Sequence, residues 1–207
     1  IFLGDQPGWS HLRRLRWIAP LILVLFAVFT TYYTVPADAV GVVLRFGKFL
    51  SIEQPGLHFK LPLGIDEVDT VRVKRQLKLE FGFGTADATN PDQVGDEPLR
   101  EKSMVTGDLN AALVEWIVQY HVEDPQLYLF HVRDPGWTLR DLSEAVMREV
   151  VGDRTVDEVI TSGRSEIEIA ALARLRELSK GYQLGIAVDL LQLKNVNPPR
   201  EVQASFN

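Results

Sequence analysis

The sequence predicts an α+β protein: a single N-terminal transmembrane helix, then a two-part folded domain, then the start of a further helix. Three observations predict this layout. Residues 17–35 form an uncharged apolar block, residues 37–122 are mostly alternating apolar and polar side chains, and residues 125–180 follow a helical period. A last strand is expected at 186–196. The domain is therefore interpreted as a β-rich part followed by a β-α-α-α-β part.

The composition limits the class of protein. The chain has 207 residues, 46% of them hydrophobic, and no cysteine, which excludes a disulfide scaffold, a thiolate metal site and a cysteine nucleophile. Its net charge of −6 argues against general nucleic-acid binding, because that function needs a basic surface. Residues 1–16 carry +2, residues 17–35 carry no charge, and the remainder carries −8. A short basic tail, an uncharged block and an acidic body thus follow one another.

The uncharged block, WIAPLILVLFAVFTTYYTV, predicts a transmembrane helix over residues 17–35. As a helix it spans about 28 Å, close to the hydrocarbon thickness of a bilayer. Aromatic residues lie at both of its ends, where the membrane interface favours them. Three arginines upstream predict that residues 1–16 form a cytoplasmic tail and that the acidic body lies outside. The predicted anchor residues are Trp17, Pro20, Phe26, Tyr32 and Tyr33.

Two other interpretations compete with the anchor. Residues 37–39 (ADA) resemble a signal-peptide cleavage site, but signal peptides have apolar cores of only about 7–15 residues. A buried core helix of this length is seldom apolar on every side. We therefore interpret residues 17–35 as a retained signal anchor.

The first part of the domain, residues 36–81, is predicted to be β-rich. An early strand is expected where Val40, Val42, Leu44 and Phe46 alternate with other residues. A later, half-exposed strand is expected at 71–81 (VRVKRQLKLEF), with its apolar residues on one face.

Four apolar residues between these strands form a candidate membrane-surface contact. They follow the predicted membrane exit closely, so they could enter the outer leaflet. They could equally close the core of the first part, and the sequence leaves both interpretations open. The residues are Phe49, Leu50, Ile52 and Leu57.

Residues 82–102 predict a loop insert, because glycine, proline and aspartate are scattered there without a period. The second part, residues 103–196, opens with a hairpin that turns at TGDLN. Helix starts are then expected at Asp124-Pro125, at an N-cap on Thr138, at the capping box TVDE and near residue 163.

Candidate catalytic residues are few. The sequence contains no P-loop, zinc-protease or serine-hydrolase motif. Lys102 and Ser103 are adjacent, but neighbours on an extended segment point to opposite faces and cannot share a proton. His121 and His131 could supply two ligands of a metal site, but no third ligand is evident. We therefore expect no enzyme activity, no catalytic residue and no metal or other cofactor.

Several stretches resemble the SPFH superfamily, also called band seven, which includes stomatins, prohibitins and flotillins. They include VPADAVGVVLRFGKF, MVTGDLN, VEWIVQYHVEDPQLYLFHVRDP and NVNPPREVQASFN, and the resemblance covers essentially all of residues 35–207. The pieces VVGDRTVDEV and VNPPREVQASF are typical of one branch of the superfamily. The long 82–102 insert is the main departure, because many members shorten it.

The resemblance to that branch implies a protein of the bacterial inner membrane, with its domain on the periplasmic side. Copies would assemble with one another, or with an HflC-like sister subunit, into a ring or cage that modulates the ATP-dependent membrane protease FtsH. The helix expected at 197–207 would be the start of a coiled coil with a neighbouring subunit. Its entry residues are Pro198, Pro199, Val202 and Phe206.

A competing interpretation is a general organiser of lipid microdomains, without a protease partner. Both interpretations make the chain a non-enzymatic scaffold whose partners are other copies and the lipid bilayer. Neither involves nucleic acid.

Overall fold

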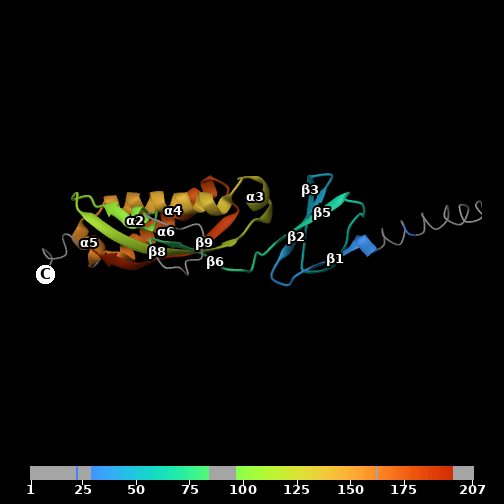
Figure 1. Cartoon of the computed structure of the whole chain (residues 1–207), viewed down its shortest axis with the longest axis horizontal. Coiled ribbons are helices and arrows are strands. Elements are labelled where there is room, and N and C mark those ends of the chain that lie inside the picture. Colours follow the sequence, from blue (N-terminus) through green and yellow to red (C-terminus); the bar gives the residue numbers. More distant parts are fainter. Residues whose placement is uncertain (1–21, 23–28, 84–96, 162, 198–207) are drawn as a thin grey trace, which may run out of the picture. The chain divides into compact units, whose positions relative to one another are not determined.

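The computed structural model describes residue 22 and residues 29–83, 97–161 and 163–197 (Figure 1). The chain divides into two compact units, residues 1–72 and residues 73–207. The sequence places the boundary between the two parts at residues 81 and 82 instead. The difference arises because the strand that ends at Phe81 pairs with a strand of the second unit.

The first unit contains two small antiparallel sheets. β1 (Tyr32–Val35) pairs with β4 (Gly56–Phe59). In the other sheet, β2 (Val40–Arg45) lies between β3 (Lys48–Glu53) and β5 (Asp66–Val71). The core of this unit consists of Val35, Ala39, Val40, Val42, Val43, Leu44 and Val71.

The predicted strand through Phe46 is confirmed only as far as Arg45. β2 is buried on both faces up to Leu44, so the expected half-exposed alternation is absent. Phe46 lies in the turn between β2 and β3, with a positive φ of 51° and 80% of its surface exposed. Gly47 beside it has φ 75°, a backbone conformation that glycine adopts without strain. Two left-handed residues end the strand there.

The prediction that the transmembrane helix extends to Val35 is wrong. Residues 29–31 are helical, but Tyr32–Val35 form β1, whose backbone pairs with β4. Aromatic and β-branched residues favour strands, and this local preference outweighs hydropathy here. No helix within the described part of the chain is long and apolar enough to cross a membrane. Residues 17–21 and 23–28 of the predicted span lie outside the described residues.

The second unit is built on one antiparallel sheet around β8 (Ala111–Val122). β6 (Leu77–Phe81) and β7 (Ser103–Val105) pair with β8, as does β9 (Ile186–Asn197). Trp116 faces both Phe81 and Leu193, and Leu113 faces both Ser103 and Asn197. β6 and β7 therefore lie end to end along one side of β8, with β9 along the other.

Two aspartate–proline pairs start helices of the second unit. α3 (Pro125–Phe130) follows Asp124, and α4 (Pro135–Gly152) follows Asp134. Each aspartate accepts hydrogen bonds from the first free backbone N–H groups, and each proline fills a position that needs no donor. The first start is confirmed. The predicted N-cap Thr138 is wrong, because Asp134 begins that helix a turn earlier.

Two further helices agree with their sequence signals. α5 (Val156–Ile160) has the predicted capping box, in which Thr155 and Glu158 exchange hydrogen bonds. α6 (Arg164–Gly181) begins and ends within one residue of the expected bounds. The TGDLN turn also joins β7 to β8 as predicted, and Gly107 there donates to the carbonyl of Arg154.

α4 and α6 cover one face of the sheet and form the core of the second unit with it. They supply Leu139, Val146, Met147, Val151, Ile167, Ala171 and Leu175 to this core. Trp116 and Phe81 are the largest side chains buried beneath them.

Three predicted boundaries change. The expected strand at 71–81 is two strands, because β5 ends at Val71 and β6 begins only at Leu77. The last six residues of the predicted 82–102 loop form the helix α2 (Glu97–Lys102). Asn197 ends β9 and does not start a helix.

Candidate functional site

An exposed apolar surface covers one face of the β1–β4 ribbon. Leu57 and Phe59 alternate with inward residues along β4 and are 61% and 76% exposed. Tyr32 of β1 lies directly opposite Phe59 and is 52% exposed. Opposite residues of an antiparallel pair share a face, so these three side chains lie together.

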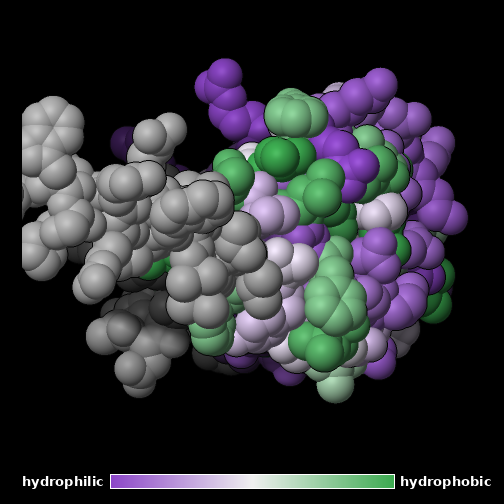
Figure 2. Space-filling view, turned by 90° about the vertical axis from the view of Figure 1, so that its right-hand side faces the viewer, coloured by the Kyte–Doolittle hydropathy of each residue, from purple (hydrophilic) through white to green (hydrophobic). Residues whose placement is uncertain are grey.

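The same surface extends along the chain at both ends of the ribbon. Leu61 and Leu63 are exposed in the loop that follows β4, and Phe29 is exposed just before β1. Figure 2, which looks at the first unit, shows hydrophobic side chains in green gathered in groups beside hydrophilic ones. We call this set the apolar surface: Phe29, Tyr32, Leu57, Phe59, Leu61 and Leu63.

The chemistry of the apolar surface is that of a contact site. Scattered exposed apolar residues are normal, whereas a grouped set usually marks a protein or membrane contact. Each leucine or phenylalanine that leaves water for an apolar phase contributes about 1.5–3 kcal/mol. Even partial insertion of a few of these side chains would hold the first unit at a bilayer surface.

An ion pair fixes the loop that carries Leu61 and Leu63. The Arg45 guanidinium donates two hydrogen bonds to the Asp66 carboxylate, at 2.8 and 3.0 Å, and the Leu61 N–H donates a third at 2.9 Å. These bonds stabilise the charged carboxylate, so they lower the pKa of Asp66 to about 2, with the Arg45 hydrogen bond as the largest cause. The loop from Leu61 to Asp66 is thereby closed at neutral pH.

Three of the four residues predicted for membrane contact lie on β3 and do not share a face. β3 alternates, so Leu50 and Ile52 lie on its exposed side while Phe49 lies on the half-buried side. Phe49 thus fits the core-closing interpretation, whereas Leu50, Ile52 and the exposed Leu57 of β4 remain candidates for contact with a membrane.

The other predicted site residues divide between described and undescribed parts of the chain. Tyr32 belongs to the apolar surface, whereas Tyr33 points to the opposite face of β1, where its ring lies 5.7 Å from that of His58. The remaining anchor and coiled-coil entry residues lie outside the described residues: Trp17, Pro20, Phe26, Pro198, Pro199, Val202 and Phe206.

Most of the apolar surface was missed at the sequence level, although a signal was present. In GLHFKLPLG, Leu57, Phe59, Leu61 and Leu63 alternate with polar residues or proline. This pattern identifies one face of an extended segment, but it does not say whether that face is buried or exposed. Only the pairing of β4 with the edge strand β1 decides it.

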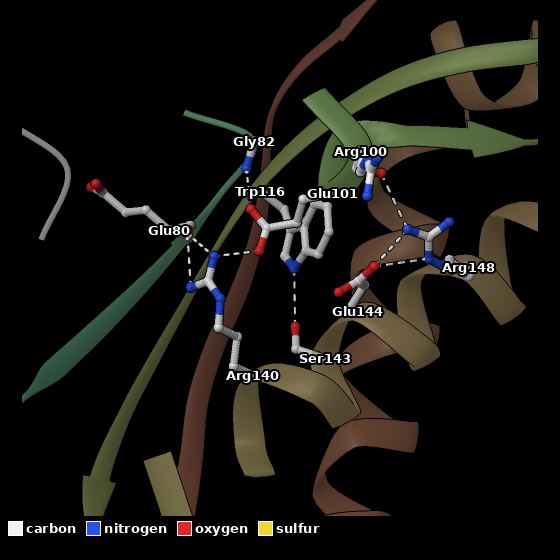
Figure 3. Close-up of polar contacts among 9 residues, drawn as sticks. All are labelled: Glu80, Gly82, Arg100, Glu101, Trp116, Arg140, Ser143, Glu144 and Arg148. Carbon is white, nitrogen blue, oxygen red and sulfur yellow. Dashed lines mark hydrogen bonds and ion pairs between the residues drawn. The ribbon is translucent and has the colours of Figure 1, made fainter. Parts of the chain in front are cut away.

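A buried polar network joins the two ends of the insert to α4 (Figure 3). Glu101 of α2 pairs with Arg140 of α4, and both are about 6% exposed. The second Glu101 oxygen accepts from the Gly82 N–H at 2.9 Å. Arg140 also donates to the Glu80 carbonyl at 3.2 Å. The network therefore ties the end of β6 to α2, the helix that follows the undescribed residues 84–96.

Aromatic packing surrounds this network. The Arg140 guanidinium carbon lies 4.6 Å from the centre of the Phe81 ring, which stacks on Trp116 at 4.4 Å. The Trp116 indole N–H donates to the Ser143 hydroxyl at 3.0 Å. Each polar group named here has a partner, so the network stabilises the unit and offers no open position for a ligand.

The sequence candidates for chemistry are engaged in surface pairs. The Lys102 ammonium pairs with Glu115 at 3.2 Å, and Ser103 begins β7 on the solvent side. His121 contacts Asp189 at 2.8 Å through Nδ1, and His131 follows α3 as its C-cap. Within the described residues, no three His, Cys, Asp or Glu side chains form a group that could hold a metal ion.

Comparison with known proteins yields HflK proteins. The chain is 39% identical to Protein HflK of Treponema pallidum over 168 residues and 35% identical to that of Borreliella burgdorferi over 185. These matches cover 80% and 88% of this chain, and 51% and 58% of the relatives. It is 33% identical over 208 residues to the "Modulator of FtsH protease HflK" of Escherichia coli K12, covering 99% of this chain and 43% of that protein. The chain thus spans about half the length of these relatives.

The family match extends over most of the chain. Residues 33–207 match the model described as SPFH domain / Band 7 family, which begins within β1 and includes both units from there. The resemblance inferred from the sequence motifs is therefore confirmed, and the chain belongs to the SPFH domain / Band 7 family.

Proposed function

We propose that this chain is a non-enzymatic membrane scaffold that modulates an FtsH-type membrane protease by assembling around it. The observation that carries the membrane part is the apolar surface of the first unit, which directly follows the apolar segment of the sequence. The protease part is supported by similarity to a relative named a modulator of FtsH protease. The buried network supports a structural role for the second unit.

In this proposal the apolar segment before β1 anchors the chain in the inner membrane, with the basic tail in the cytoplasm. Because β1 begins at Tyr32, the span ends before it, and Tyr32 belongs to the folded unit at the outer membrane surface. The apolar surface then enters the adjacent leaflet. Two attachments, the segment and the surface, orient the unit against the bilayer better than a single one.

Assembly is the second element of the proposal. Copies of the chain, or copies alternating with an HflC-like sister subunit, close into a ring or cage. The helix expected from Pro198 onward would form the coiled-coil wall, because a lone amphipathic helix is marginal in water and gains stability from a neighbour. A closed ring needs two different complementary faces on each copy.

The test of the proposed function is purification of the full-length protein from native inner membranes. An FtsH-type protease should co-purify, and degradation of a membrane substrate by that protease should change when the scaffold is deleted. In a fragment that begins at Phe29 and therefore lacks the proposed anchor, Phe59→Ser with Leu63→Ser should lower flotation with liposomes more than Leu109→Ser, which removes an exposed leucine of the second unit. Equal flotation of the two variants contradicts the membrane role of the apolar surface.

The second candidate function is a lipid-microdomain organiser without a protease partner. The apolar surface favours it equally, because contact with lipid requires no protease. Absence of the protease from gently solubilised particles that still contain many copies would select this function over the first.

A further inference from the structure

Charged side chains of α6 run along the free edge of β9. Arg176 donates to the carbonyls of Val188 and Asp189, at 2.7 and 3.0 Å. Near the other end of the strand, Arg164 donates to the carbonyls of Leu193 and Lys194, at 3.3 and 2.8 Å. These backbone groups belong to the edge of β9 that does not face β8.

One backbone N–H of the same edge is also occupied. The Leu193 N–H donates to the Glu168 carboxylate at 2.8 Å. Arg164, Glu168 and Arg176 lie on one i, i+4 row of α6, interrupted only by Leu172, which packs on the core. This row therefore offers donors and an acceptor in the places where the backbone of an added strand would offer them.

A second row on α4 occupies the opposite edge of the sheet. Arg140 donates to the Glu80 carbonyl of β6, and Arg148 donates to the Ser103 carbonyl at the start of β7 at 3.4 Å. Glu144 lies between them on the same helix face. It accepts a hydrogen bond from the guanidinium of Arg148 and so holds Arg148 in place. Side chains of α4 and α6 thus form hydrogen bonds to backbone groups on both sides of the sheet, those of β6 and β7 on one side and those of β9 on the other.

Free strand edges are a hazard for a protein whose copies are crowded together. Unpaired backbone groups of an edge accept a strand from another chain, which leads to uncontrolled association. Natural sheets commonly protect an edge with charges, bulges or a covering element, and β9 also carries bulges near Asn195 and Asp189. Guanidinium groups that fill the edge carbonyls add a specific block, since charge-assisted hydrogen bonds are stronger than neutral ones.

We propose that these two charged rows close the sheet of the second unit against strand addition by a second copy of this chain. Contacts between second units in an assembly are then made by side-chain surfaces and not by shared sheets. The proposal rests on the proposed function only in that crowding of copies makes the protection useful. Its test is made at the β9 edge and needs no protease.

The test opens the β9 edge and measures strand pairing between copies. Because the chain has no cysteine, Gln192→Cys places a single reporter thiol on β9, where Gln192 is exposed. The full chain in detergent is compared with and without Arg164→Ala, Glu168→Ala and Arg176→Ala together, using a short thiol–thiol crosslinker. The matched control is Arg174→Ala with Glu177→Ala, an exposed pair on α6 whose ion pairs join these two residues and link Arg174 to Glu149 of α4, away from β9.

The triple variant should give about tenfold more crosslinked dimer than the parent, since the opened edge gains the energy of one or two backbone hydrogen bonds. The control should match the parent. A triple variant that folds, as judged by circular dichroism, and shows no rise overturns the proposal. So does equally strong crosslinking in the parent. If the triple variant does not fold, Glu168→Ala alone should give a smaller rise, and no rise overturns the proposal as well.

Discussion

Removing the Glu101 carboxylate should strongly destabilise the second unit. Glu101→Ala leaves the Arg140 guanidinium buried, about 6% exposed, without its anionic partner. It also removes the acceptor of the Gly82 N–H. Breaking a buried ion pair by deleting one partner costs about 3–5 kcal/mol, because the remaining charge is not compensated. An orphaned backbone donor adds about 1–3 kcal/mol.

The two costs overlap, so we expect a total loss of about 3–5 kcal/mol in the free energy of unfolding. Urea unfolding measures this loss, followed by tryptophan fluorescence in a variant that keeps Trp116, which is buried beside the network, and replaces the other three tryptophans with phenylalanine. The matched control is Glu144→Ala, which removes a half-exposed i, i+4 pair with Arg148 and should cost only about 0.3–0.5 kcal/mol.

Replacing both partners separates a buried-charge effect from a simple loss of contacts. Glu101→Leu combined with Arg140→Leu should recover much of the loss, because apolar pairs of similar volume often match buried ion pairs in stability. A loss below about 1 kcal/mol for Glu101→Ala would refute the reasoning, since it would mean that the charge of Arg140 is compensated by other groups.

Three further outcomes are expected. Because the pKa of Asp66 is lowered to about 2 from its ordinary value of 3.8, its ion pair with Arg45 contributes fully to stability above pH 3.8 and loses that contribution as the pH falls toward 2. Asp66→Asn should therefore flatten this part of the curve of unfolding free energy against pH. Gly107→Ala should cost about 1–3 kcal/mol in thermal unfolding, because its Cβ would lie 2.8 Å from the carbonyl oxygen of Gly152. Leu109→Asn should leave the free energy of unfolding unchanged or raise it by up to about 1 kcal/mol. Leu109 is 87% exposed and has φ 62°, a left-handed conformation that asparagine tolerates better than leucine. A clear loss in Tm would contradict this.

Local signals made much of the second unit predictable. Asp124-Pro125 and the capping box at Thr155 act within a few residues of each other, so the sequence contains all of the information that they need. The alternation through Trp116 likewise predicts a half-buried strand, because one face of β8 lies beneath the helices. Asp134-Pro135 carries the same helix-start signal as Asp124-Pro125, whereas Thr138 only precedes the apolar stripe.

The features that the sequence did not predict depend on contacts between distant parts of the chain. Tyr32 to Val35 are uncharged like the segment before them, and their pairing with β4 makes them a strand and not the end of the span. Glu101 and Arg140 are 39 residues apart, and no local pattern indicates that they meet. The exposure of Phe59 depends on which face of a two-stranded ribbon is left uncovered, which alternation alone does not determine.

The central claim is that this chain works as an assembly on a membrane and not as a single molecule. The most direct measurement is the mass and shape, by electron microscopy, of particles extracted from native membranes with a mild detergent. We predict closed rings or cages of many copies that contain the protease. Solitary molecules of the mass of one chain would contradict the account.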